Sequence, residues 1–211
     1  NGLLLTDELA RFFAQQAYLL GVSLDGPQPL HDRYRLDAAG AGSFAGVWRG
    51  IERLRRNQVE FNILTLVTQA NVRRGAEVYR YLCEQGCRFH QFIPCGEADS
   101  SGALLAFSIA GAVWGEFLCQ IYDQWIRGDT RRVSIRIFDA ILNLLVDQRQ
   151  VDCQMRSTCD AYFVVEHNGD IFPCDFFVTR ELCLGNIAAT PWRALPDLPL
   201  YRQFVRRKSA W

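Results

Sequence analysis

The sequence has no long hydrophobic run and no excess of charge of either sign. Its longest apolar stretch, from Ala103 to Trp114, is interrupted by Ser108 and is too short to cross a bilayer. The first residues lack the basic, apolar and small-residue order of a secretory signal, so we expect a cytoplasmic protein with no membrane partner. Lys plus Arg and Asp plus Glu each number 23, which leaves no net field to attract nucleic acid.

Histidine is also scarce, whereas cysteine is abundant. The three histidines, His31, His90 and His167, show no spacing that suits a metal ion, and His90 falls inside a stretch that predicts a buried strand. The 211 residues include 8 cysteines. Because no secretory signal is present, thiolate chemistry explains at least some of these cysteines better than disulfide bridges do.

The rest of the pattern alternates strands and helices. Short apolar runs predict strands at 18–24, 61–67 and 88–94, and apolar residues at helical spacing predict helices between them. Strand–helix repeats with short links are typical of right-handed βα units around a parallel sheet, so we expect an α/β fold over residues 1–150. From residue 151 the pattern changes to a hairpin and loops, which predicts a second region over 151–211.

Local signals add detail to the helices. We expect Phe12 on the buried face of a first helix and Ser43 as the capping residue of the next. Cys119 lies among apolar residues of a later helix and is expected in the core. A further helix over 135–146 has the residues to begin as a strand.

In parallel βα folds, binding sites lie at the carboxyl ends of the strands. That edge would present Ser23 and Asp25 after the first strand, Thr68 after the second and residues 91–95 after the third. Arg35 can reach back over the same edge and hold a carboxylate or a ribose. Each of these side chains can equally be a loop residue that satisfies local backbone groups.

Three cysteines gather in the segment from Cys153 to Asp175. Two short runs of strand character flank an Asn-Gly pair at 168–169, which is the strongest short-range hairpin signal. Cys159 and Cys174 should therefore meet at the open end of a hairpin, with Cys153 near enough in sequence to join them. We interpret the three thiolates as ligands of a metal or a cluster, with Asp175 as an acid/base group on its rim.

Other interpretations of this segment stay open. A disulfide across the hairpin is geometrically possible, and a zinc ion would accept three thiolates plus one more ligand. Asp175 can also simply cap a turn. The fourth ligand would come from another cysteine such as Cys183, from a substrate, or from residues outside this sequence.

Several stretches together resemble one protein family. They are LLGVSLDGPQPLHDRYR, VEFNILTLVTQANV, FHQFIPC, RVSIRIFDAILNLL and, above all, the cysteine segment that closes with PCDFFVTRELCLGNI. The most specific piece is Cys, nine residues, Gly, four residues, Cys, which Cys159, Gly169 and Cys174 satisfy. The sequence thereby resembles the anaerobic sulfatase-maturating enzymes, which are radical S-adenosylmethionine (SAM) proteins with a SPASM extension.

The resemblance implies a fold and a set of cofactors. The fold would be an incomplete radical SAM partial (β/α)6 barrel over 1–150, followed by the first half of a SPASM domain with a β-hairpin over 151–211. SAM would bind on a [4Fe-4S] cluster, with Ser23 and Arg35 matching positions that contact it. Two auxiliary [4Fe-4S] clusters and a sulfatase polypeptide as partner are also implied, for a protein that we expect to be a monomer.

The resemblance also implies roles in the chemistry. Cys153, Cys159 and Cys174 match three ligands of the first auxiliary cluster, so this chain would ligate that cluster only in part. Asp175 matches the general base that takes the proton of the target Cys or Ser, while a 5′-deoxyadenosyl radical removes hydrogen from the β carbon. The auxiliary clusters would accept the electron, and the product would be Cα-formylglycine.

The sequence departs from this family in three ways. It lacks the Cys-x3-Cys-x2-Cys motif, the glycine-rich SAM motif and the later SPASM cysteines. We therefore expect an internal fragment of the enzyme that is inactive by itself. Two alternatives are a different SPASM peptide modifier that forms thioethers or crosslinks, and a non-catalytic binding module with a zinc or thiol site.

Overall fold

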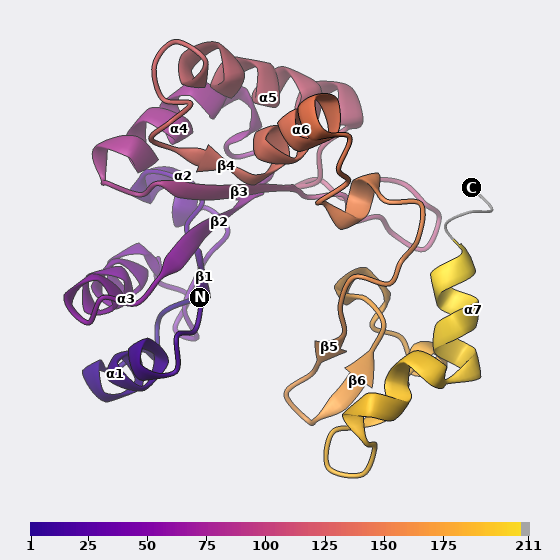
Figure 1. Ribbon diagram of the computed structural model, residues 1–211. Helices are drawn as coiled ribbons and strands as arrows, with labels where there is room; N and C mark the ends of the chain where they lie inside the picture. Colours follow the sequence, from indigo (N-terminus) through magenta and orange to yellow (C-terminus); the bar gives the residue numbers. More distant parts are fainter. Residues whose placement is uncertain (208–211) are drawn as a thin grey trace. The chain divides into compact units, whose positions relative to one another are not determined.

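The computed structural model describes residues 1–207, and the chain packs as two compact units (Figure 1). The first unit runs from Asn1 to Asp139, and the second begins at Ala140. Within the described residues, the helices are all too short or too polar to cross a bilayer. The division at 150/151 drawn from the sequence concerns family domains rather than packing units, and it stays a prediction.

A parallel sheet in the order β1-β2-β3-β4 organises the first unit. Its strands are β1 (Leu20–Ser23), β2 (Phe61–Val67), β3 (Phe89–Pro94) and β4 (Ser134–Ile135). The register pairs Val22 with Ile63 and Ile63 with His90. Because every strand lies beside its neighbour in the sequence and runs the same way, all carboxyl ends meet at one edge, as the βα pattern predicts.

Helices connect and cover these strands. They are α1 (Asp7–Gln15), α2 (Gln28–His31), α3 (Phe44–Arg56), α4 (Gly75–Glu84), α5 (Gly111–Trp125) and α6 (Arg136–Asp147), with a 3-10 turn, η1 (Val72–Arg74), before α4. The backbone N–H of Leu9 donates to Oγ1 of Thr6, which caps α1. β4 continues directly into α6, so the helix that was expected to begin as a strand does so.

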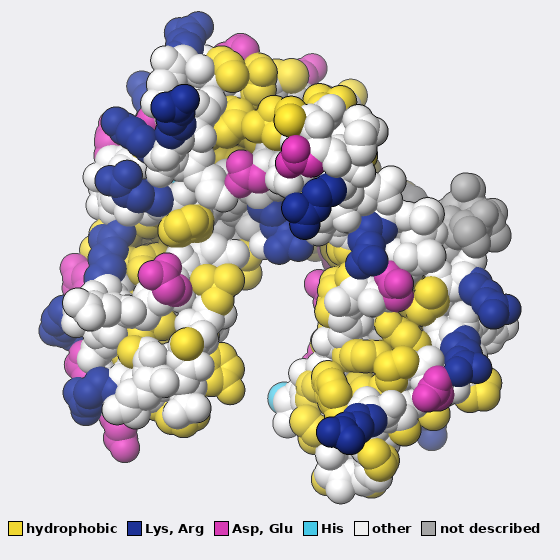
Figure 2. All heavy atoms as spheres, viewed as in Figure 1, with side chains coloured by type: hydrophobic (Ala, Val, Ile, Leu, Met, Phe, Trp, Pro, Cys, Tyr) yellow, Lys and Arg dark blue, Asp and Glu magenta, His cyan; other side chains and the backbone are white. Residues whose placement is uncertain are grey.

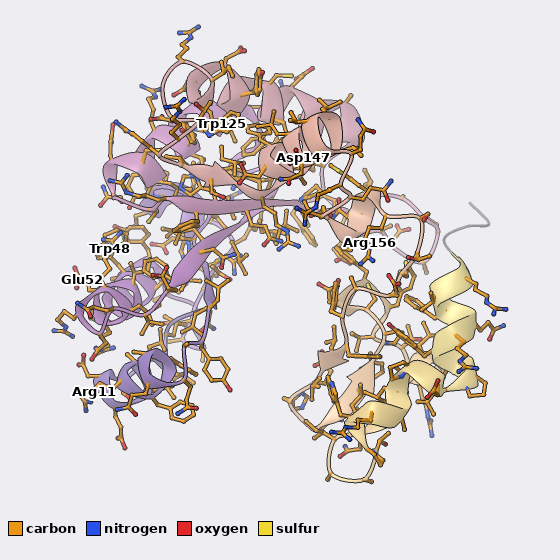
Figure 3. The ribbon with its side chains drawn as sticks, in the orientation of Figure 1. Arg11, Trp48, Glu52, Trp125, Asp147 and Arg156 are labelled. Atoms are coloured by element: carbon orange, nitrogen blue, oxygen red, sulfur yellow. The ribbon has the colours of Figure 1, made fainter. Side chains whose placement is uncertain are left out.

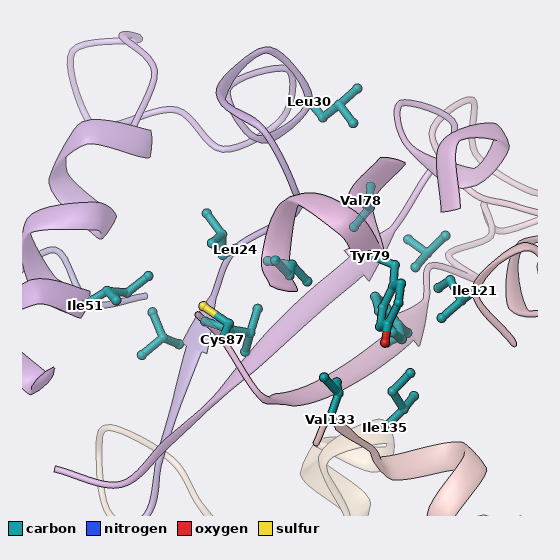
Figure 4. Packing of buried hydrophobic residues seen from close by; sticks show 14 of the residues in the cluster. Leu24, Leu30, Ile51, Val78, Tyr79, Cys87, Ile121, Val133 and Ile135 are labelled. Carbon is teal, nitrogen blue, oxygen red and sulfur yellow. The ribbon is translucent and has the colours of Figure 1, made fainter. Parts of the chain in front are cut away.

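The core of the first unit lies between the sheet and its helices (Figure 4). Alternate strand residues such as Val22 and Ile63 are buried against Ile51 of α3 and Leu82 of α4. Complete burial of one such side chain contributes about 1.5–3 kcal/mol, so this layer supplies most of the stabilisation of the sheet. Trp125, labelled in Figure 3, donates its indole N–H to the carbonyl of Val133 at 2.8 Å and thereby joins the end of α5 to the segment before β4.

Two sequence expectations about burial are wrong. Cys119 is exposed, because Phe117 and Ile121 of the same helix point into the core and a residue two positions away faces the opposite side. Phe12 is 48% exposed, and the buried residue of α1 is Ala10. Helical spacing identifies an apolar face but does not reveal whether another element covers it.

The opening residues of the chain rest directly on α3. A Cβ atom at Gly50 would lie 2.3 Å from the carbonyl oxygen of Gly2, which no real side chain tolerates. Nη1 of Arg53, one turn further along α3, donates to the carbonyl of Leu5 at 2.8 Å. Gly50 therefore permits a backbone-to-helix contact that any larger residue would prevent.

The second unit is smaller and rich in loops. Its antiparallel strands are β5 (Val164–Val165), β6 (Asp170–Phe172) and β7 (Gly185–Asn186), and its last helix is α7 (Pro199–Arg207). Short 3-10 turns fill the rest: η2 (Cys153–Met155), η3 (Asp175–Phe177), η4 (Arg180–Leu182) and η5 (Trp192–Asp197). Its core centres on Ile171, Leu184, Leu195 and Tyr201.

Hydrophobic side chains also gather on the surface of the second unit, on the face presented in Figure 2. The exposed residues include Phe176, Phe177 and Trp192, with Phe176 at 67%.

The hairpin predicted from the Asn-Gly pair is confirmed: Val164 pairs with Phe172, and Gly169 adopts the left-handed conformation at φ 87° that the turn needs.

His90 on β3 is a buried side chain with one unsatisfied nitrogen. Its Nε2 bonds to the carbonyl of Cys87 at 3.0 Å, and its Nδ1 has no hydrogen-bond partner within the described part of the chain. Its ring packs edge-on against Tyr79 and Phe92. Burial lowers the pKa of His90 from 6.5 to about 4, so the imidazole is neutral in the folded protein at neutral pH.

We expect His90 to make the protein sensitive to acid. The unfolded chain takes up a proton at His90 near pH 6.5, whereas the folded protein resists until about pH 4, so the free energy of unfolding falls as the pH drops between these values. The shift corresponds to about 3 kcal/mol, with no contribution above pH 6.5. Urea denaturation of His90→Leu at several pH values should show a flatter pH dependence than the wild type. His167→Gln, which changes an exposed histidine, should retain the wild-type slope, and an unchanged slope in His90→Leu would contradict the prediction.

Candidate functional site

The three cysteines of the 153–175 segment line one cavity in the second unit, with a volume of about 390 Å³. Cys153 begins the 3-10 turn η2, Cys159 lies in the loop before the hairpin, and Cys174 follows β6. The hairpin pattern was expected to gather these cysteines, and all three line this one cavity. Cys183 is not among the lining residues, and its Sγ donates instead to the carbonyl of Gly185 at 3.6 Å.

The register of the hairpin explains how the cavity mouth forms. Val164 faces Phe172 across the antiparallel pair, so an extension by two residues sets Tyr162 opposite Cys174. The hydroxyl of Tyr162 lies 3.8 Å from Sγ of Cys174, which agrees with this extension. The hairpin therefore leads both residues to one wall of the cavity, just beyond its last paired residues.

The walls of the cavity are largely apolar. Besides the cysteines and Gln154, they consist of Ala161, Tyr162, Pro173, Phe176, Phe177 and Phe204. Burial raises the pKa of the Cys174 thiol, because an isolated thiolate is poorly solvated in such surroundings. A bound cation or cluster would reverse that preference, since metal binding requires and stabilises the deprotonated form.

The spacing of these side chains bears on the choice between a single metal ion and a cluster. Among residues 1–207, no three His, Cys, Asp or Glu side chains lie close enough to hold one metal ion. In a [4Fe-4S] cluster each thiolate binds a different iron, so the sulfurs stand further apart than around zinc. The cavity of about 390 Å³ is many times the roughly 30 Å³ that one water occupies, which leaves room for such a group. None of the eight cysteines, all within the described range, forms a disulfide.

Asp175 stands beside Cys174 at the rim of this cavity. Its side chain is exposed, and its Oδ1 accepts a hydrogen bond from the hydroxyl of Tyr162 at 2.6 Å. Sγ of Cys174 lies 3.5 Å from the same oxygen. The side chain of Asp175 therefore bonds to Tyr162 and Cys174. The alternative interpretation expected this side chain to cap a turn, but η3, the 3-10 turn that begins at Asp175, has no side-chain cap.

Tyr162 is a site residue that the sequence did not single out. Burial raises the pKa of Tyr162, and its hydrogen bond to Asp175 raises it further, so the phenol stays protonated and donates to the carboxylate. The signal that would have found it is the strand register, because Tyr162 and Cys174 are equidistant from the centre of the hairpin.

A second cluster of polar side chains lies at the carboxyl edge of the sheet in the first unit. Arg35 reaches back over this edge, and the carboxylate that it holds is Asp25, with Nε to Oδ2 at 2.5 Å and Nη2 to Oδ1 at 3.2 Å. Oδ1 of Asp25 also accepts the backbone N–H of Leu66 at 2.9 Å. Asp25 is buried, and a hydrogen bond to a charged group contributes roughly 1.5–3 kcal/mol.

Ser23 and Ser43 complete the description of this edge. Ser23 is half-buried at the end of β1, one residue before the turn that carries Asp25. Ser43 does not cap α3 with its side chain, contrary to expectation. Its Oγ donates instead to the carbonyl of Arg35 at 2.9 Å, while the N–H of Phe44 at the start of α3 donates to Oδ1 of Asp32 at 2.9 Å.

Other residues predicted at this edge serve the local backbone. Oγ1 of Thr68 accepts from the N–H of Ala70 at 3.2 Å, and Cys95 is buried with its Sγ 3.8 Å from Oγ of Ser108. Gln91 lies on the same cross-strand row as Ser23, two strands away. Thr68 and Cys95 thus fit the loop-residue interpretation, whereas Ser23 and Arg35 keep partly exposed polar side chains at this edge.

Comparisons with known proteins agree on one family. Residues 153–211 match the family described as SPASM, an iron-sulfur cluster-binding domain. The chain is 38% identical over 202 residues to a serine-type anaerobic sulfatase-maturating enzyme of Bacteroides thetaiotaomicron, covering 89% of this chain and 49% of that protein. It is 35% identical over 208 residues to a cysteine-type enzyme of Clostridium novyi, covering 97% and 56%.

A solved structure is similar to almost the whole chain. It is native anSMEcpe with bound AdoMet and the Kp18Cys peptide, with a TM-score of 0.87 and 33% sequence identity. The match covers 99% of this chain and 59% of that one. The chain thus spans about half the length of the curated relatives that it matches.

We expect the cysteines that line the cavity to bind iron and sulfide. Anaerobic reconstitution of Cys153→Ala, Cys159→Ala and Cys174→Ala should leave each variant with less iron and sulfide than the wild type. Loss of a hydrogen-bond partner to a ligand already weakens metal binding by roughly 10–100-fold, and loss of the ligand itself should cost at least as much. Cys183→Ala is the matched control, because this cysteine lies outside the cavity wall. Zinc without sulfide in the wild type would contradict the prediction and favour a zinc module.

Proposed function

Because the chain belongs to the anaerobic sulfatase-maturating enzymes, which are radical SAM proteins with a SPASM domain, we propose that the full-length protein oxidises a cysteine or serine of a sulfatase polypeptide to Cα-formylglycine. The observation that carries this proposal is the apolar cavity lined by Cys153, Cys159 and Cys174 with Asp175 at its rim. The relatives include serine-type and cysteine-type enzymes, so both targets belong to the proposal.

In this proposal, the three cysteines hold the first auxiliary [4Fe-4S] cluster together with a fourth ligand from elsewhere. The apolar walls keep water from the cluster, which influences its reduction potential, as do hydrogen bonds to the sulfurs. Held there, such a cluster would supply an acceptor for the electron that the oxidation releases. The SPASM match over 153–211 supports this assignment, and we propose residues 151–211 as the SPASM region and 1–150 as the barrel region.

Asp175 takes the proton in this mechanism. When bound, SAM supplies the radical that removes one hydrogen atom from the β carbon of the target residue. The thiol or hydroxyl proton of the target goes to the carboxylate of Asp175, so that two hydrogens leave in total, and the auxiliary clusters would take up the remaining electron. A serine target is then an aldehyde, whereas a cysteine target is a thioaldehyde, which water converts to the aldehyde with release of hydrogen sulfide. Asp175 is exposed and therefore accessible to a polypeptide, and Tyr162 holds its Oδ1 at 2.6 Å.

Ser23 and Arg35 are the residues proposed to contact SAM. Arg35 is 27% exposed while Asp25 holds one side of its guanidinium, so its remaining N–H groups can meet a carboxylate. The hydroxyl of Ser23, at the end of β1, adds a neutral donor. We also propose a cytoplasmic location, because cluster ligands need reduced thiols. The expectation of a monomer stays part of the proposal.

The test is the oxidation of a peptide under anaerobic, reducing conditions. The full-length protein with SAM should convert the target residue of a peptide with the pattern Cys/Ser-x-Pro/Ala-x-Arg to the aldehyde: a serine loses two hydrogens, and a cysteine loses two hydrogens and exchanges its sulfur for the oxygen of water. We expect Asp175→Asn to lower the rate by roughly 100-fold or more, because positioned acid–base catalysis contributes about 10²–10⁴-fold. Mass spectrometry of the peptide measures both results.

Matched variants separate the roles of the residues at the rim. Asp170→Asn changes a carboxylate on β6 away from the cavity and should retain the wild-type rate. The 211-residue chain alone should give no product, because it lacks the Cys-x3-Cys-x2-Cys motif. A thioether or a crosslink in place of the aldehyde would reject this function and indicate another SPASM peptide modifier.

A further inference from the structure

The guanidinium of Arg35 is held rigidly from one side. Asp25 accepts from Nε at 2.5 Å and from Nη2 at 3.2 Å, which is the side-on, two-bond geometry of an arginine–carboxylate pair. Asp25 is only 5% exposed, and its Oδ1 is itself fixed by the N–H of Leu66. The position of the guanidinium is therefore tied to the backbone of β2 through one buried carboxylate.

The main chain of Arg35 is held by a second set of contacts. Oγ of Ser43 donates to the carbonyl of Arg35 at 2.9 Å, and the same Oγ lies 3.1 Å from Nε2 of His31. Nδ1 of His31 accepts the backbone N–H of Asp25 at 3.3 Å. The contacts thus form a closed ring that leaves Asp25 by its side chain and returns to Asp25 by its backbone.

The direction of each hydrogen bond in the ring follows from counting donors. Because Nδ1 of His31 accepts a hydrogen bond from a backbone N–H, it carries no hydrogen, and the hydrogen of the neutral ring must be on Nε2. Nε2 then donates to Oγ of Ser43, which leaves the hydroxyl hydrogen for the carbonyl of Arg35. His31 is completely buried, and burial lowers its pKa, which agrees with the neutral tautomer that this order of bonds needs.

The ring leaves one fork of Arg35 open. A guanidinium has five N–H groups, and Asp25 engages the one on Nε and one on Nη2. The second N–H of Nη2 and the nearer N–H of Nη1 form a parallel pair at the other end. The side chain is 27% exposed, so this pair can meet a second carboxylate without displacing the first.

We propose that Asp25, His31 and Ser43 are positioning residues that set the open fork of Arg35 for the carboxylate of SAM. The inference rests on the proposed function, in which Arg35 contacts SAM. An arginine side chain normally loses rotamer freedom when it binds a ligand, and that loss weakens binding. Here the side chain and its backbone are already fixed on folding, so the ligand meets a preorganised partner.

The first test compares the affinity of full-length, cluster-loaded variants for SAM by anaerobic equilibrium dialysis. Arg35→Ala should weaken SAM binding, and Asp25→Asn and Ser43→Ala should each raise the dissociation constant by about tenfold, since each removes a bond that fixes Arg35. Ser43→Thr keeps the hydroxyl and should restore most of the affinity. Thr65→Val is the matched control: it removes a buried hydroxyl that bonds to the carbonyl of Leu24 at 2.8 Å, outside the ring.

Each outcome of this test decides a separate question. Unchanged affinity in Arg35→Ala would reject the SAM contact of Arg35 in the proposed function. Weakened binding in Arg35→Ala with wild-type binding in Asp25→Asn and Ser43→Ala would overturn the positioning role alone. A third outcome is that Thr65→Val loses as much SAM affinity as Asp25→Asn and Ser43→Ala and shows the same thermal midpoint as those two variants. That result would attribute the lost affinity to general destabilisation and would also overturn the positioning role.

A second measurement tests the ring without SAM. Nitrogen-15 NMR of the imidazole of His31 at neutral pH should show a hydrogen-free Nδ1 and a protonated Nε2 in the wild type. Ser43→Ala should shift the Nε2 resonance, because that nitrogen loses its acceptor, whereas Thr65→Val should not. A charged imidazole, or the tautomer with hydrogen on Nδ1, would contradict the order of bonds on which the proposal depends.

Discussion

Parallel pairing of β1, β2 and β3 is the constraint on which the first unit depends. Because the three strands run in one direction and in sequence order, the residues that follow them meet at a single edge. Asp25 follows β1 there, and its carboxylate accepts from Arg35 of a later loop and from Leu66 of β2. Nδ2 of Asn71 donates to the carbonyl of Asp25 at 3.1 Å, so the turn after β2 is joined to the same point. One buried carboxylic acid residue thereby joins segments that lie far apart in the sequence.

The second unit has a different source of order. Among the described residues, its main buried cluster holds four side chains, which is a small core for a region that consists mainly of short turns. Small domains of this kind usually need a disulfide or a metal to add stability, and no cysteine here forms a disulfide. A cluster held by Cys153, Cys159 and Cys174 would fulfil that need, since metal-binding free energy becomes folding free energy when the site forms only in the folded chain.

Periodicity and turn chemistry were enough to predict the parallel sheet and the hairpin, because these features depend on local patterns. The Asn-Gly turn predicted that Cys159 and Cys174 would meet, and the short distance in sequence predicted that Cys153 would join them; all three line one cavity. The pairing of Arg35 with Asp25, and the use of Ser43 away from its helix, depend on where a loop folds back, which no local pattern encodes. Tyr162 was missed for a related reason, since its role depends on the register beyond the last paired residues. Family resemblance supplied the cofactors, which the residues by themselves left open between iron and zinc.

The contact between Gly50 and the backbone of Gly2 limits which residues α3 can carry at position 50. A methyl group at position 50 would clash with the backbone of Gly2 and push the first residues of the chain away from α3. The bond from Arg53 to Leu5 would lengthen with it, so a single carbon atom would detach a whole peptide segment. The missing side chain at Gly50 is therefore what allows the first residues of the chain to pack directly against the backbone of α3.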